Sequence, residues 1–202
     1  MMGRLINDKR KTKFIIIGLI VAVVALAAVM FSVSVINRAN KAAESSGEET
    51  EGLGTVAIDD SEERAQELYE CRVEDVNDTA AVVKLMETMG MEGIIGKYTA
   101  TITKEDNVQV LSIDMEEAVQ ASNRKLLDDG MVKCSQQLMA LMPSVGKVQW
   151  SYSVLSAEAG DETVSVSLNT EEAAEQLGHD IQEYGKSADA FRSLLTQQLG
   201  EN

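Results

Sequence analysis

The side chains of this sequence that could perform chemistry are few, and they form no recognised catalytic pattern. His179 is the single histidine, so multi-histidine zinc sites are excluded and serine–histidine or cysteine–histidine catalysis has only one candidate base. It lies beside Asp180 in a predicted helix, and the sequence contains no G-x-S-x-G nucleophile motif. A surface or helix-cap role for His179 is therefore preferred, and no catalytic residue is assigned.

The two cysteines, Cys71 and Cys134, allow two interpretations. An oxidising exterior would permit a disulfide, which would close a loop of about 60 residues. Alternatively, both are buried thiols that act as small hydrophobic side chains. The geometry that decides between these readings is not contained in the sequence. No C-x-x-C pair occurs, so neither a redox motif nor a zinc knuckle is predicted.

The acidic clusters do not predict a metal site. Asp75–Thr79 resembles the start of a calcium loop, but Ala80 replaces the required glycine and Met86 replaces the bidentate glutamate. Asp128 and Asp129 are expected on a solvated helix face. No metal and no cofactor is therefore predicted.

Trp150 and Tyr152 alternate with polar residues along one predicted strand. Aromatic side chains on one strand face can stack on a sugar, but they more often belong to a hydrophobic core. We interpret this pair as core residues.

The charge distribution excludes one large class of partners. Residues 1–36 hold five basic and one acidic residue of the chain's 18 and 33, so residues 37–202 have a formal charge of −19. Such a surface repels phosphate backbones, and nucleic-acid binding is not expected. Solubility at a crowded surface is the simpler interpretation of this acidity, and attraction to a basic partner is the alternative.

An uncharged apolar run, FIIIGLIVAVVALAAVMFSVSVIN, begins at Phe14. A bilayer core requires about 20 apolar helical residues, so we predict a transmembrane helix over 14–36. Five basic residues precede the run and two follow it closely, which predicts that 1–13 form a cytoplasmic tail. A cleaved signal peptide is the alternative, but its apolar region has only about 7–15 residues and ends in a small-x-small site. An uncleaved anchor is preferred.

The remaining chain is predicted to lie outside the cell. Residues 37–60 are rich in Ser, Gly and Glu and are expected to form an acidic flexible tether. Residues 61–202 are expected to form one extracytoplasmic domain.

Periodicity predicts the elements of this domain. Helical spacing predicts a helix over 79–89, capped by Asn77 or Asp78 and ended by Gly90. Three further helices are expected over 114–142, 171–183 and 187–199, with Asp114, Thr170 and Ser187 as caps, Gly130 as a point of interruption and Pro143 as the end of the first. Extended or alternating segments predict strands over 69–76, 98–103, 108–113, 148–154 and 164–168.

The resulting order is β-α-β-β-α-β-β-α-α. Clean alternation is typical of antiparallel sheets with one solvated face. We therefore predict an α+β fold in which an antiparallel sheet of about five strands has helices packed on one face, preceded by one transmembrane helix.

Three stretches carry a resemblance to a known family. They are Asn77-Asp78 followed by TAAVVKLMETM, the Leu127–Met142 helix leading into KVQWSYSV, and the closing run TEEAAEQLGHDIQEYGKSADAFRSLL. Together they resemble a family of uncharacterised bacterial membrane-tethered domains, some of which are attached to metallopeptidase-type receptors that sense β-lactams. The resemblance covers roughly residues 66–199 and implies a location in the bacterial cell envelope. It implies no chemistry, and no peptidase part is expected among these residues.

These observations predict a single-pass, membrane-anchored interaction or sensor module without catalytic activity. Its partners are expected to be the membrane, through one helix, and another envelope or membrane protein. A small-ligand-binding domain is the alternative, and an envelope hydrolase is less favoured.

Overall fold

The computed structural model describes residues 33–36, 54–155 and 162–200. The predicted tail 1–13, most of the predicted transmembrane helix 14–36 and most of the tether 37–60 lie outside the described residues. Among the helices that the structure does describe, none combines the length and apolar character needed to cross a membrane. The last four residues of the predicted helix, Val33–Ile36, form a strand instead, and three of the four, Val33, Val35 and Ile36, are β-branched, as suits a strand.

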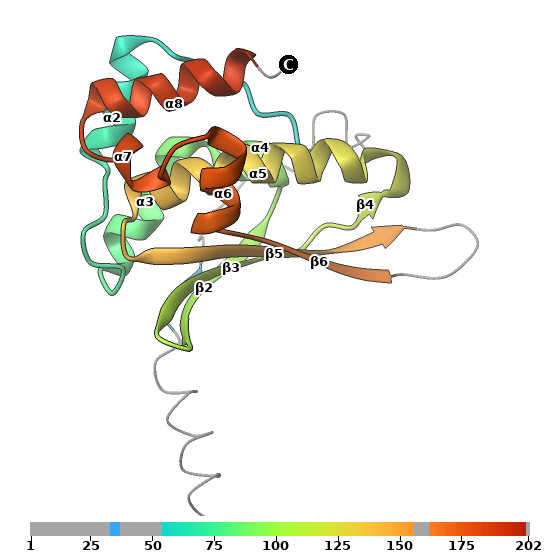
Figure 1. Ribbon diagram of the computed structural model, residues 1–202. Coiled ribbons are helices and arrows are strands. Elements are labelled where there is room, and N and C mark those ends of the chain that lie inside the picture. Colours follow the sequence, from blue (N-terminus) through green and yellow to red (C-terminus); the bar gives the residue numbers. More distant parts are fainter. Residues whose placement is uncertain (1–32, 37–53, 156–161, 201–202) are drawn as a thin grey trace, which may run out of the picture. The chain divides into compact units, whose positions relative to one another are not determined.

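One mixed sheet forms the base of the described domain (Figure 1). Its strands are β1 Val33–Ile36, β2 Tyr98–Glu105, β3 Val108–Met115, β4 Val119–Gln120, β5 Val145–Leu155 and β6 Glu162–Asn169. The pairs β1–β2, β2–β3 and β5–β6 are antiparallel, whereas β3 and β4 both run parallel to β5.

The α+β class is confirmed, but the prediction of an antiparallel sheet is wrong. Helix α5, Arg124–Leu141, connects β3 to β5 as a crossover. A crossover returns the chain to the same end of the sheet, so the two neighbouring strands must run parallel. Alternation in the sequence reports which face is buried, and it does not report strand direction.

Helices cover one side of this sheet in Figure 1. They are α2 Glu62–Glu70, α3 Thr79–Met89, α4 Met91–Ile95, α5 Arg124–Leu141, α6 Thr170–Leu177, α7 Ile181–Tyr184 and α8 Ala188–Gly200, with a short 3-10 turn at Ala121–Asn123. The core lies between helices and sheet, where Ile113 of β3, Leu138 of α5 and Val148 of β5 are fully buried.

Several predicted elements are confirmed. Helix α3 has the predicted bounds, and the Asp78 carboxylate accepts a hydrogen bond from the Ala81 N–H at its start. The β2–β3 hairpin turns through Asp106 and Asn107, both of which have positive φ. At the start of α8, the Ser187 hydroxyl accepts from the Ala190 N–H.

Two predicted boundaries in the first part of the domain are wrong. The expected strand over 69–76 is absent from the described residues, because α2 extends to Glu70 and an irregular segment follows. Ser61 caps α2, and Ala65 and Leu68 give that helix a buried face. The helix expected from Asp114 begins only at Arg124, since Asp114 pairs with Thr99 within the hairpin.

Two glycines behave differently from the prediction. Gly130 does not interrupt α5 but lies buried within it. Gly178, with φ 73°, ends α6, so the helix expected over 171–183 is divided into α6 and α7. The cap of α6 is Asn169 rather than Thr170, because Asn169 forms a reciprocal capping box with Glu172.

Candidate functional site

His179 stands apart from other chemically active side chains. It is exposed in the connection between α6 and α7. Its ring forms an edge contact with Tyr184, with 6.5 Å between the ring centroids. This placement gives the imidazole a packing contact, and no serine or cysteine of the described residues is hydrogen-bonded to it.

Both cysteines are free thiols. Cys134 is buried in α5, and this burial raises the pKa of its thiol to about 12. It therefore stays protonated and cannot act as a nucleophile at neutral pH. Cys71 is partly buried after α2, with its Sγ 3.5 Å from Thr88 Oγ1. The two cysteines serve as buried or half-buried packing residues, and the disulfide interpretation is wrong.

The segment that resembles a calcium loop is the turn that leads into helix α3. The Asp75 carboxylate accepts hydrogen bonds from the backbone and side-chain N–H groups of Asn77, at 2.9 and 2.7 Å, and these bonds lower the pKa of Asp75. Asp78 caps α3. Across residues 54–155 and 162–200, no group of three or more His, Cys, Asp or Glu side chains is placed to hold a metal ion.

Asp128 is a structural residue, so the prediction of a solvated face is wrong at this position. Its Oδ1 accepts a hydrogen bond from Trp150 Nε1 at 2.9 Å, and its two oxygens lie 3.0 and 2.9 Å from the Tyr152 hydroxyl. Trp150 and Tyr152 are each 1% exposed, so their interpretation as core residues is confirmed. Burial, reinforced by the Asp128 carboxylate, raises the pKa of Tyr152 to about 12.

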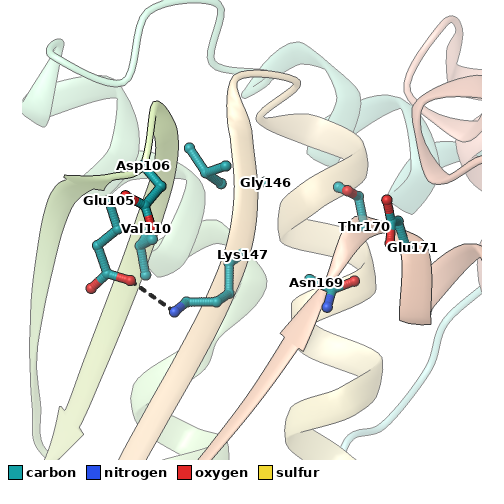
Figure 2. A pocket seen from close by; sticks show the side chains of 9 residues that line it. Glu105, Asp106, Val110, Gly146, Lys147, Asn169, Thr170 and Glu171 are labelled. Carbon is teal, nitrogen blue, oxygen red and sulfur yellow. Dashed lines mark hydrogen bonds and ion pairs between the residues drawn. The ribbon is translucent and has the colours of Figure 1, made fainter.

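A pocket of about 340 Å³ opens at one end of the sheet (Figure 2). Three separate segments form it, namely the β2–β3 turn, the start of β5 and the junction of β6 with α6. We call it the sheet-end pocket. Its lining residues are Glu105, Asp106, Val108, Val110, Gly146, Lys147, Asn169, Thr170 and Glu171.

Strand register brings the pocket residues together. Val110 of β3, Lys147 of β5 and Asn169 of β6 are cross-strand neighbours in one row. Gly146 is an extra residue in β5, because the register with β3 shifts at that point. Such bulges redirect the strand and its side chains, and here the bulge lies in the pocket wall.

The pocket is lined by more negatively than positively charged side chains. The Lys147 ammonium of β5 lies 2.9 Å from Oε2 of Glu105 at the end of β2, and Figure 2 marks this ion pair with a dashed line. Asp106 and Glu171 contribute two further carboxylates from opposite sides of the pocket. Within the described residues neither of these two carboxylates has a hydrogen-bonding or ionic partner, so both are available to a ligand.

The apolar part of the pocket comes from Val108 and Val110. Val110 is buried, whereas Val108 is 43% exposed at the pocket rim. A Cβ added to Gly146 would lie 2.6 Å from Val108 Cγ1, so the glycine leaves room for this valine. The pocket thus combines an apolar wall with unpaired carboxylates.

No predicted site residue lies in this pocket. Lys147 and Glu105 are 42 positions apart and meet only through the sheet. The sequence signals available were the acidic hairpin turn, which includes Glu105 and Asp106, and the acidic start of the helix that follows β6. Neither signal alone indicates a pocket.

The face of the sheet opposite the helices carries mainly hydroxyl side chains. Its half-buried or exposed residues include Thr99, Thr101, Ser112, Gln149, Ser151, Ser165 and Ser167. The Ser151 hydroxyl donates a hydrogen bond to Asp114 across the parallel pair. This face leads toward the row that contains Lys147.

Searches against protein-family models, curated proteins and solved structures give no match to this chain.

Proposed function

We propose that the protein is a non-catalytic recognition module that is held on the outer face of a membrane and binds another envelope or membrane protein. The observation that carries this proposal is the sheet-end pocket, with its apolar wall and its two carboxylates free to bind. Ligand pockets commonly combine an apolar lining with a few convergent polar groups. The residues that we assign to recognition are Asp106, Val108 and Glu171.

The placement of the chemically active residues supports a binding role over catalysis. His179 and both cysteines lie outside the pocket lining. General acid–base catalysis requires a base within hydrogen-bond reach of the reacting group. The Lys147 ammonium contacts Glu105, and this ion pair joins β5 to the end of β2 in the pocket wall. We therefore assign these residues no catalytic step.

The membrane part of the proposal rests on the apolar run that begins at Phe14 and precedes β1, and on the five basic residues before it. In this proposal the chain crosses the membrane once, its N-terminus is cytoplasmic, and the domain faces the bacterial cell envelope. Protease added to intact protoplasts should remove a C-terminal tag. Protection of the tag would show that the orientation is reversed.

Site-specific photo-crosslinking in living cells tests the recognition role. A photoreactive amino acid at Val108, which is 43% exposed at the pocket rim, should yield a discrete crosslinked protein. The same amino acid at Leu126, which is 49% exposed on α5 and outside the pocket lining, provides the matched control. Absence of a product at position 108, or identical products at both positions, would contradict the proposal.

A small-ligand-binding domain is the second candidate, favoured by the pocket volume of about 340 Å³. This volume lies at the lower end of the range of roughly 300–1,000 Å³ for ligand pockets. A small ligand that fills the pocket would prevent the photoreactive amino acid at position 108 from reacting with another protein, so no crosslinked protein would form. A shift in thermal stability with a metabolite mixture would then identify the class of ligand.

A further inference from the structure

We propose that the sheet-end pocket receives the cationic side chain of a lysine or arginine from a basic segment of a partner protein. This inference rests on the proposed recognition function and specifies the chemistry of the partner.

The charge balance of the pocket selects a cation. Glu105, Asp106 and Glu171 line the pocket together with a single basic residue, Lys147. Because Lys147 already neutralises Glu105 at 2.9 Å, the two remaining carboxylates define the field that a ligand meets. An anionic ligand would be repelled by both, whereas an ammonium or guanidinium group would be attracted by both and can donate a charge-assisted hydrogen bond to either.

The shape of the pocket selects a long aliphatic stem. Val108 and Val110 form an apolar wall beside the carboxylates. Lysine and arginine bury their methylene stems along apolar surface while the charged head reaches polar groups. A volume of about 340 Å³ suits one such side chain better than a large organic ligand.

The charge of the whole domain favours a macromolecular source for this side chain. Residues 37–202 have a formal charge of −19, which attracts a basic segment over a long range and accelerates its encounter with the domain. The long-range field is not specific. The pocket supplies specificity, because it combines an apolar wall with two free carboxylates, whereas the second pocket, lined in part by Asp59 and Arg64, has a single carboxylate beside a basic residue.

Calorimetric titration of the full-length chain in uncharged detergent tests the inference. The probe is an acetylated eight-residue peptide that alternates lysine and glycine, and its control contains norleucine, which keeps the stem but lacks the charge. We expect binding of the lysine peptide that weakens with added salt, and no binding of the norleucine peptide.

Two double variants separate the pocket from the general acidity. Asp106→Asn with Glu171→Gln should weaken lysine-peptide binding by about 10-fold, because both carboxylates that attract the cation lose their charge. Glu62→Gln with Glu63→Gln removes the same charge from α2, outside the pocket lining, and should change affinity by less than about 2-fold. Val108→Lys should also weaken binding, because it places a competing cation at the rim. Circular dichroism establishes that each variant is folded.

The outcomes are distinct from those of the crosslinking experiment. If neither peptide binds, or if both double variants weaken binding equally, the assignment of a cationic side chain is wrong. A crosslinked product at Val108 would in that case leave the recognition function standing. Loss of both the crosslink and the peptide binding would overturn both proposals.

Discussion

Gly54 and Gly130 meet backbone to backbone, so closely that a Cβ added to Gly130 would lie 2.1 Å from the Gly54 carbonyl oxygen. Gly54 has φ +85°, and its N–H donates to the Ile94 carbonyl at 2.7 Å. This contact packs the start of the segment 54–60 against α5. At the other end of the segment, Arg192 Nε of α8 donates a hydrogen bond to the Asp60 carbonyl at 2.7 Å. The part of the predicted tether that the structure describes is therefore packed on the domain.

Gly130→Ala should lower the free energy of unfolding by about 1–3 kcal/mol, because the added methyl group would overlap the Gly54 backbone. Gly93→Ala in α4 is the matched control. A Cβ at Gly93 would meet nothing within 4 Å, and alanine should be neutral or stabilise by up to about 1 kcal/mol. Urea unfolding measures both changes. Equal values for the two variants would mean that residues 54–60 do not rest on α5.

Trp150→Ala should lower the free energy of unfolding by about 3–5 kcal/mol, because the side chain is 1% exposed and fills the space between β5 and the helices. Ser151→Ala, next to it on the open face, should cost less than about 0.5 kcal/mol. Its bond to Asp114 is exposed and contributes little. Small effects of both substitutions would contradict the burial of Trp150.

The free energy of unfolding should fall as the pH rises from about 10 to 12. Burial raises the pKa of both Tyr98 and Tyr152 to about 12, above the ordinary value of 10. Between these values the unfolded chain has released protons that the native chain retains, so alkali favours unfolding. Urea unfolding at several pH values measures this slope. A double variant with phenylalanine at both positions should show a shallower one.

Asp128→Asn should lower the pKa of Tyr152 and leave that of Tyr98 unchanged. The Asp128 carboxylate contributes to the raised pKa of Tyr152, whereas Tyr98 is affected by burial, Glu92 and Glu87. The amide oxygen of asparagine can still accept the bond from Trp150, so the fold should persist. The ultraviolet absorbance of tyrosinate, recorded in Tyr98→Phe and Tyr152→Phe backgrounds, separates the two titrations. A change in the pKa of Tyr98 in place of Tyr152 would contradict this assignment.

Alkylation at neutral pH should modify Cys71 and spare Cys134. Cys71 is only partly buried, whereas Cys134 is fully enclosed and burial raises its pKa to about 12. Mass spectrometry should find one modified thiol in the native protein and two after denaturation. A peptide that links the two cysteines would instead establish a disulfide.

His179→Ala should leave the crosslink at Val108 and the binding of the lysine peptide unchanged. His179 is exposed beyond the end of α6 and does not line the sheet-end pocket. Loss of function in a folded His179→Ala variant, present at normal levels, would contradict the non-catalytic proposal and favour an envelope hydrolase.

Local patterns in the sequence were sufficient to predict the elements with strong end signals. Helix α3 has both a capping Asp78 and a terminating Gly90, and its bounds are those predicted. The β2–β3 hairpin has alternating faces and a polar turn, and it too is confirmed. Capping and alternation depend on residues within a few positions of one another, so a single sequence records them directly.

Only the tertiary structure determined the contacts between segments that are distant in the sequence. The crossover through α5 sets the parallel pairing of β3 and β5, and alternation is the same for either direction. From the sequence, Asp128 is predicted to be solvated. In the folded chain, Trp150 and Tyr152 of β5 donate hydrogen bonds to its carboxylate. The sheet-end pocket likewise arises when three segments meet at one edge, because its field and shape belong to their arrangement in space and to none of the segments separately.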